Sequence, residues 1–131
     1  MASDISEQVR SDVARRAGHR CEYCLIHEDD AGFPHQIDHV LSGKHGGSSD
    51  FENLAYACVP CNRHKGSDIA SISPTTGEAV RLFHPRRDRW RDHFRLEGDF
   101  IQALTDVGIV TIRLLHLNAV ERVAERGLLG S

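Results

Sequence analysis

Two Cys-x-x-Cys pairs constrain this chain more than any other feature of its sequence. All four cysteines fall in these pairs, Cys21/Cys24 and Cys58/Cys61, with residues 25–57 between them. Two paired thiolates from distant positions are the usual ligands of a tetrahedral structural zinc site. A redox dithiol and free core cysteines are the competing interpretations, and the presence of both pairs disfavours them. The sequence therefore predicts a Zn²⁺ ion that holds an early loop against a later helix.

Length and composition are those of an ordinary soluble protein of one compact domain. The chain has 131 residues, of which 40% are apolar and 27% charged, and its formal net charge is -3. No apolar stretch approaches the roughly 20 residues that span a bilayer, and the first residues lack the features of a signal peptide. We therefore expect no membrane partner and a cytoplasmic location, where such cysteine pairs seldom form structural disulfides.

The order of apolar and turn residues predicts a mixed α/β domain with a small sheet. Helices are expected over 6–16, 60–65, 107–117 and 120–129, strands over 35–41 and 78–83, a short helix within 86–95 and a hairpin over 94–104. Residues 53–57 fit a second strand or a single helical turn, and residues 28–34 and 43–50 fit loops. We expect a single domain over 1–131, with a core at 19–68 and a C-terminal extension at 69–131 that packs on it.

Polar residues between and beside the cysteines indicate a second metal site. Asp38 and His39 are adjacent on the expected strand, Asn53 follows a glycine turn, and Asn62 directly follows Cys61. A carboxylate, an imidazole and an amide oxygen, brought together by the zinc, would suit Mg²⁺ or Mn²⁺. Adjacent residues of a regular strand point to opposite faces, so Asp38 and His39 can share a site only at a bulge or a strand end.

The stretch from Cys21 to Gly66 resembles the zinc-containing, four-cysteine bacterial branch of the HNH endonucleases. It has, in the family's order, Cys-x-x-Cys, Asp-His-Val, a Gly-Gly turn, Asn-Leu and Cys-x-x-Cys-Asn-x-x-Lys-Gly. The resemblance implies an α+β fold, a ββα-metal finger stapled by a four-cysteine zinc site and followed by a C-terminal α/β extension. It also implies that His39 is the general base, that Asp38 and Asn62 hold a catalytic divalent ion, and that Asn53 braces the loop and orients His39.

The chemistry of phosphodiester hydrolysis agrees with these roles. A neutral imidazole is a competent base near neutral pH, and a hard cation stabilises the transition state and the departing oxygen. We therefore expect a metal-dependent endonuclease that hydrolyses DNA, with structural Zn²⁺ and catalytic Mg²⁺ or Mn²⁺. A homodimer is one way in which it would cut both strands. The rival interpretations are a non-catalytic zinc-stabilised nucleic-acid-binding module and a thiol–disulfide redox protein.

Six further residues are weaker candidates for the site. His64 competes with Asn62 for the third family position, and His35 fits a plain strand residue as well as a site residue. The other four flank the expected site and would contact backbone phosphates: Lys44, His45, Arg63 and Lys65. Since the net charge is negative, DNA binding would depend on such a local patch and weaken with salt. The arginines of 86–95 fit an ion-paired helix that anchors Trp90 at least as well as a DNA-binding stripe.

Overall fold

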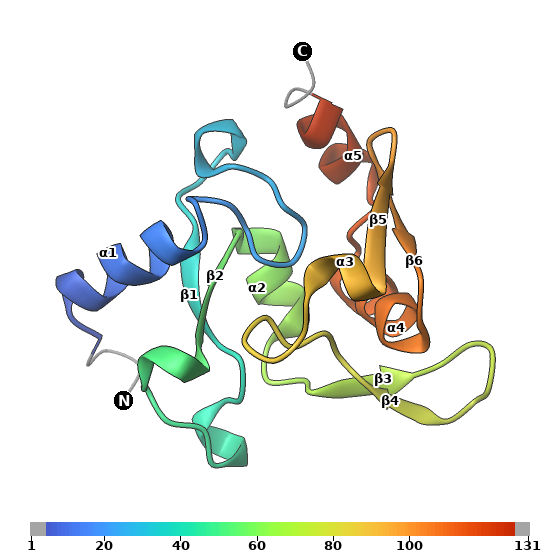
Figure 1. Ribbon diagram of the computed structural model, residues 1–131, viewed down its shortest axis with the longest axis horizontal. Helices are drawn as coiled ribbons and strands as arrows, with labels where there is room; N and C mark the ends of the chain where they lie inside the picture. Colours follow the sequence, from blue (N-terminus) through green and yellow to red (C-terminus); the bar gives the residue numbers. More distant parts are fainter. Residues whose placement is uncertain (1–4, 128–131) are drawn as a thin grey trace.

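Short helices and strands alternate along the chain, and the computed structural model describes residues 5–127 (Figure 1). The helices are α1 (Glu7–Arg16), α2 (Val59–Lys65), α3 (Trp90–His93), α4 (Asp106–Leu115) and α5 (Val120–Gly127). The strands are β1 (Gln36–His39), β2 (Leu54–Ala57), β3 (Ala70–Ile72), β4 (Ala79–Arg81), β5 (Phe94–Glu97) and β6 (Phe100–Ala103). Single 3-10 turns lie at Glu28–Asp30, Gly43–His45 and Phe51–Asn53. Within 5–127, every helix falls short of the length and apolarity that crossing a membrane requires.

The strands form three separate antiparallel pairs, β1–β2, β3–β4 and β5–β6. The single small sheet expected from the sequence is thus replaced, over the described residues, by three two-stranded ones. Each strand has only three or four residues. Helices α1 and α2 cover the β1–β2 pair, whereas the other two pairs keep exposed apolar side chains such as Ile72 and Phe100. The ambiguous residues 53–57 resolve into the end of a 3-10 turn followed by β2.

Helix α1 covers one face of the β1–β2 pair (Figure 1). It begins after Ser6, whose side chain accepts a hydrogen bond from the Val9 amide at 3.1 Å. Val13 is fully buried and packs with Leu54 and other apolar residues of that face. The opposite face of β1 looks toward α2, which follows β2 directly.

One apolar core joins the cysteine-containing half of the chain to the C-terminal half. Its buried members include the four cysteines and Tyr23 from the first half, and Phe83, Phe94 and Leu117 from the second. Trp90 packs against this core, and its Nε1 donates to the Tyr23 carbonyl oxygen at 3.0 Å. Of the two interpretations of the arginine-rich segment, the structure therefore shows the anchored Trp90.

The C-terminal half differs from the prediction mainly in the lengths of its elements. The helix expected within 86–95 is only the four residues of α3, and the strand expected over 78–83 is shortened to β4. Strand β3 was not predicted, because its residues are mostly exposed and lack a clear apolar alternation. The hairpin over 94–104 is confirmed as β5 and β6, turning at Gly98 in the left-handed region. The last two residues of the helix expected over 120–129 lie outside the described residues.

Candidate functional site

The four cysteines come together in the core of the protein. All are buried and free of disulfides, and their sulfur atoms lie within 4.8 Å of one another. The Cys24 and Cys58 sulfurs are 3.6 Å apart. Zinc–sulfur bonds of about 2.3 Å place the sulfurs of a tetrahedral site about 3.8 Å apart, so this cluster fits a zinc ion.

Two local turns aim the sulfurs at one point. In the first, the Cys21 amide donates to the Ile26 carbonyl at 2.8 Å, and the Cys24 amide donates to the Cys21 sulfur at 3.4 Å. Leu25 closes this turn in the left-handed region, with φ 71°. In the second turn, Cys58 is the N-cap of α2 and Cys61 lies in its first turn. Each pair is therefore preformed by its own backbone.

The four thiols of the cluster act strongly on one another's ionisation. The pKa of Cys58 lies far below its ordinary value, because the thiols of Cys21, Cys24 and Cys61 hydrogen-bond to its sulfur, whereas hydrogen bonds from the same set raise the pKa of Cys24 and of Cys61. Among residues 5–127, this is the one place where three or more His, Cys, Asp or Glu side chains are grouped closely enough to hold a metal. The structural zinc site predicted from the sequence is thus supported by the geometry.

Asp38 is buried on the α2 side of β1, and only 3% of it is exposed. Its Oδ2 accepts from the Tyr23 hydroxyl at 2.6 Å, and its Oδ1 accepts from Lys65 Nζ at 3.3 Å. Burial raises the pKa of Asp38, although Lys65 and Tyr23 act in the opposite direction. Lys65 also donates to the carbonyl oxygens of His39 and Val40. The carboxylate and the ammonium together tie α2 to the end of β1.

His39 leaves β1 on the face opposite to Asp38. The strand is regular, with Asp38 opposite Ala55 and His39 opposite Leu54, and it ends at His39. The sequence predicted that Asp38 and His39 could share a site only at a bulge or at a strand end. Strand β1 has no bulge, and it ends at His39. The His39 Nε2 atom lies 3.0 Å from the Ser49 hydroxyl oxygen. The two neighbours in sequence thus have separate surroundings.

Asn53 clamps the loop that leads from β1 toward β2. Its Nδ2 donates to the carbonyl oxygens of Leu41 and Ser48 at 2.8 and 2.6 Å, and its Oδ1 accepts from the Leu41 amide at 3.0 Å. The backbone of Gly47 lies against the Leu41 carbonyl group, and a Cβ atom at this position would be 1.6 Å from the Leu41 oxygen. Only glycine therefore fits here. Ser49, next to the clamped Ser48, is the residue that contacts His39. These hydrogen bonds hold the loop, whereas the orientation of His39 by Asn53 stays a prediction.

His39 and Asn62 both line a hollow of about 300 Å³ beside β1. Asn62 Nδ2 donates to the Gln36 Oε1 atom at 2.7 Å, and Gln36 also lines the hollow. His35 lines it from the other end of the strand, with its Nε2 3.0 Å from the Ile26 carbonyl oxygen. Asp38 lies outside this lining. The structure therefore brings together two of the three residues predicted around the catalytic ion.

Comparison with known proteins supports the interpretation of this region. Residues 21–68 match the family model described as HNH endonuclease. The match covers less than half of the chain, so it shows that this segment resembles the HNH endonucleases. The resemblance predicted from the motifs is confirmed for residues 21–68, which we call the HNH segment. The match suggests a nuclease, and therefore a nucleic acid as its substrate. No curated protein and no solved structure matched the chain.

The weaker candidates of the HNH segment occupy different surroundings. Lys44 and His45 are exposed on a 3-10 turn, and Arg63 is exposed on α2. Lys65 points inward, is only 2% exposed and serves the contacts described above rather than the surface. The His64 ring packs against the His116 ring at a tilt of 46°, with the ring centroids 4.4 Å apart. Burial together with the charge of His116 lowers the pKa of His64.

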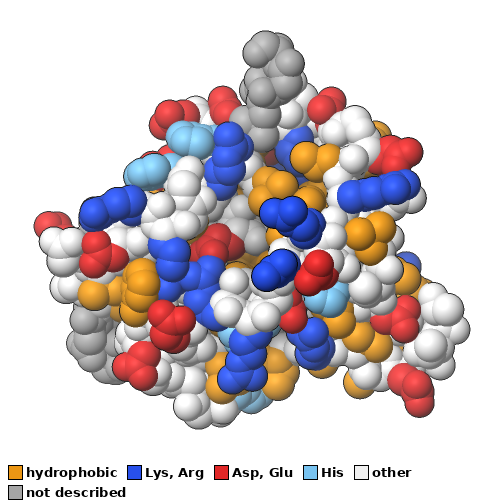
Figure 2. All heavy atoms as spheres, in the orientation of Figure 1, with side chains coloured by type: hydrophobic (Ala, Val, Ile, Leu, Met, Phe, Trp, Pro, Cys, Tyr) orange, Lys and Arg blue, Asp and Glu red, His pale blue; other side chains and the backbone are white. Residues whose placement is uncertain are grey.

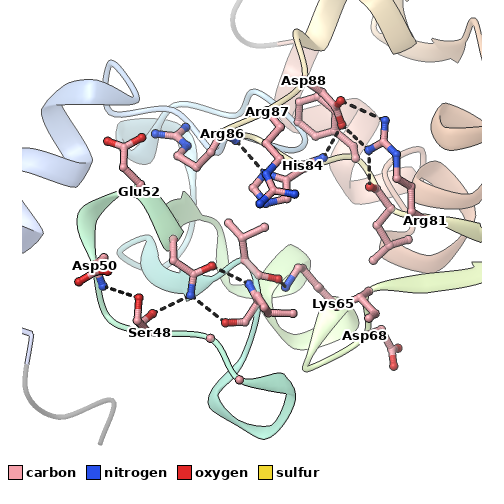
Figure 3. A pocket seen from close by; sticks show the side chains of 18 residues that line it. Ser48, Asp50, Glu52, Lys65, Asp68, Arg81, His84, Arg86, Arg87 and Asp88 are labelled. Carbon is pink, nitrogen blue, oxygen red and sulfur yellow. Dashed lines mark hydrogen bonds and ion pairs between the residues drawn. The ribbon is translucent and has the colours of Figure 1, made fainter.

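A larger cavity, of about 870 Å³, separates the HNH segment from the turn at residues 81–88 (Figure 3). Arg81 and Asp88 form a bidentate ion pair on one wall, with nitrogen–oxygen distances of 2.6 and 3.1 Å. Arg86 forms an ion pair with Glu22. Figure 2 shows Lys and Arg side chains gathered across the middle of this face, with acidic side chains among them. The charged residues of the lining balance, four against four: Lys65, Arg81, Arg86 and Arg87 against Asp50, Glu52, Asp68 and Asp88. The cavity therefore has no net charge that would select an anion.

Three residues of the site were missed by reasoning from the sequence. Tyr23 lies inside the first Cys-x-x-Cys pair, and its hydroxyl reaches Asp38. Ser49 lies in a Gly/Ser run whose composition indicates only a loop. Arg122 lies within hydrogen-bond distance of the Cys58 sulfur from α5, far along the chain. The one sequence feature that could have indicated Arg122 is its spacing from Arg126, because residues four apart lie on the same face of a helix.

Proposed function

We propose that this protein is an endonuclease that hydrolyses DNA phosphodiester bonds, with His39 as the general base that activates water. The observation that carries the proposal is the HNH match over residues 21–68, in which His39 is partly exposed at the end of β1. In this proposal β1, β2 and α2 form the ββα unit of the family, and residues 69–131 form its extension. Lys44, His45 and Arg63 would bind backbone phosphates.

The contact with Ser49 bears on which nitrogen of His39 takes the proton. A neutral imidazole has one N–H donor and one free lone pair. With Nε2–H donating to the Ser49 hydroxyl, the Nδ1 lone pair remains to accept a proton from water. The resulting hydroxide attacks phosphorus, the bond from phosphorus to the leaving sugar oxygen breaks, and that oxygen takes a proton from solvent water. Asn53 supports this arrangement by holding the loop on which Ser49 stands.

The catalytic Mg²⁺ or Mn²⁺ ion that the resemblance implies does not fit the donor pair Asp38 and Asn62 as the structure arranges it. The Asp38 carboxylate is buried and accepts from Tyr23 and Lys65, whereas the Asn62 amide group lies at the hollow with Gln36. The two side chains therefore do not face a common point. The proposed reaction therefore uses side chains of this chain and water, and the nicking assay determines whether cleavage depends on divalent ions.

The test is nicking of supercoiled plasmid by zinc-loaded protein, with Mg²⁺, with Mn²⁺ and with a chelator that spares the zinc. We expect His39→Ala to lower the nicking rate by at least about 100-fold, the usual contribution of a general base. Zinc content and the far-UV circular dichroism spectrum should stay unchanged. His19→Asn is the matched control, because His19 lines neither the hollow beside β1 nor the larger cavity and pairs with Glu28. Cleavage by His39→Ala at the wild-type rate would refute the assignment.

A zinc-stabilised nucleic-acid-binding module is the second candidate function. It is favoured by the contacts of Asp38, because the carboxylate is buried against Lys65 of α2 and does not face an open site. Such a module would retard plasmid in a gel shift at low salt and would leave it supercoiled with either ion. Nicking that disappears in His39→Ala would exclude this alternative.

A further inference from the structure

Helix α5 is held against the protein by arginines rather than by an apolar stripe. Arg122 and Arg126 are its buried residues, only 8% and 4% exposed, and they lie about one turn apart on the same face. A helix at the surface of a domain usually buries apolar side chains. Burial of a guanidinium group is unfavourable unless acceptors or opposite charges meet it. The surface beneath α5 must therefore supply them.

The group that meets Arg122 is the cysteine cluster. Arg122 Nη1 lies 3.2 Å from the Cys58 sulfur, and this contact is buried. The other terminal nitrogen of Arg122 forms an ion pair with Glu125 on the same helix. One Zn²⁺ ion with four thiolates carries a formal charge of two minus, so a zinc-loaded cluster is an anion inside the core. Arg122 places a positive charge, with an N–H donor, on one of its sulfurs.

Arg126 fixes the position of α5 without touching a sulfur. Its Nη2 donates to the Leu117 carbonyl oxygen at 2.7 Å and to Asn118 Oδ1 at 3.0 Å, and its Nε donates to the Asp99 carbonyl oxygen at 2.7 Å. These acceptors lie in the turn before β6 and just after α4. The helix is thereby anchored to the C-terminal half, and Arg122 reaches across to the HNH segment.

We propose that Arg122 is a positioning residue of the zinc centre, and that zinc binding and the docking of α5 are coupled. Zinc assembles the anionic cluster that retains Arg122, and Arg122 stabilises the thiolate of Cys58 that binds the zinc. By linkage, α5 strengthens zinc binding by the same factor by which zinc strengthens the docking of α5. This coupling is independent of nuclease activity and holds for a binding module as well.

The first test measures zinc affinity by competition with a chromogenic chelator, using the full chain. We expect Arg122→Met to bind zinc about 10- to 100-fold more weakly, the usual effect of losing an outer partner of a metal ligand. Arg122→Lys, which keeps the charge, should fall between this variant and wild type. Arg113→Met is the control, because Arg113 is exposed on α4. Zinc affinity of Arg122→Met within twofold of wild type would overturn the proposal.

A spectroscopic readout separates a direct effect on the sulfur from general destabilisation. In protein loaded with Co²⁺, the thiolate-to-cobalt charge-transfer bands should shift in Arg122→Met, because the Cys58 sulfur loses its N–H donor. The bands of Arg113→Met should coincide with those of wild type. Identical bands in all three proteins would show that Arg122 does not act on the sulfur, and would contradict the role assigned to it.

The second test uses wild-type protein, so it does not depend on the folding of a variant. Zinc is withdrawn in steps, and amide hydrogen exchange is followed in α5 and in α1, which packs on β2 away from the cluster. We expect amides of α5 to lose protection in every molecule that loses its zinc, whereas amides of α1 keep residual protection in those molecules even though the cooperative transition is lost. Protection of α5 that persists after the zinc has gone would overturn the coupling.

Discussion

The cysteine cluster and the end of β1 lie close together, but only the cluster brings its predicted metal ligands to one point. Tyr23 connects them, since it lies between two cysteines and its hydroxyl reaches Asp38. In the cluster, four sulfurs converge within 4.8 Å. At the end of β1, the residues predicted to share an ion are divided between two sides of the strand, with Asp38 buried and His39 partly exposed.

The difference follows from how each group is positioned. Every cysteine pair is held by one tight turn, so a few local hydrogen bonds place two sulfurs at once. The set at the end of β1 depends on contacts across the fold, such as that between Lys65 and Asp38, and the alternation of a regular strand separates Asp38 from His39. A structural metal site is thus completed by local turns, whereas a catalytic set here depends on tertiary packing.

The largest expected effect comes from breaking the cluster. Cys61→Ala, or removal of zinc by a strong chelator, should abolish the cooperative thermal transition, because a structural zinc ion contributes about 10–16 kcal/mol of apparent binding free energy to folding. The measurement is far-UV circular dichroism during heating. Adding zinc back should restore the chelated wild type but not the variant. A cooperative transition that survives zinc removal would show that the apolar core suffices without the metal.

The next effect concerns the buried pair at the end of β1. Lys65→Met should cost about 3–5 kcal/mol in the free energy of unfolding, because it leaves the Asp38 carboxylate buried without its cation. The double variant Asp38→Leu/Lys65→Met should recover most of that loss, since no charge is then buried. Urea unfolding of zinc-loaded proteins measures both. Equal stability of Lys65→Met and wild type would mean that Tyr23 alone satisfies the carboxylate.

The loss in Lys65→Met should also depend on pH. Burial already raises the pKa of Asp38, and Lys65 opposes that shift, so removal of Lys65 raises this pKa further. A carboxyl group whose pKa is higher in the folded than in the unfolded protein favours folding at low pH and loses that contribution as pH rises through the folded value. The deficit relative to wild type should therefore shrink as pH is lowered from 7 toward 5, and a constant deficit would contradict this cause.

The sequence predicted the parts of the molecule that depend on local patterns. The cysteine turns, the hairpin over 94–104 and helix α1 are each encoded within a few residues. The bracing side chain Asn53 followed from the family resemblance, and its hydrogen bonds to the Leu41 backbone agree with that role. The partners of Asp38 and the contact from Arg122 to Cys58 could not be predicted, because they join residues far apart in sequence whose meeting is decided only by packing.

The smallest expected effect is that of Ser49→Ala. This change tests the role of His39 in catalysis and leaves the zinc-binding cysteines intact. Ser49→Ala removes the hydroxyl beside His39 Nε2, and a neutral hydrogen bond contributes about 0.5–1.5 kcal/mol, which corresponds to about a two- to tenfold slower nicking rate. Ser48→Ala is the matched control, because its hydroxyl contacts only the Asp50 amide among the described residues. Zinc content should be the same in both. Nicking by Ser49→Ala at the wild-type rate would show that the contact with Ser49 does not orient His39 for catalysis.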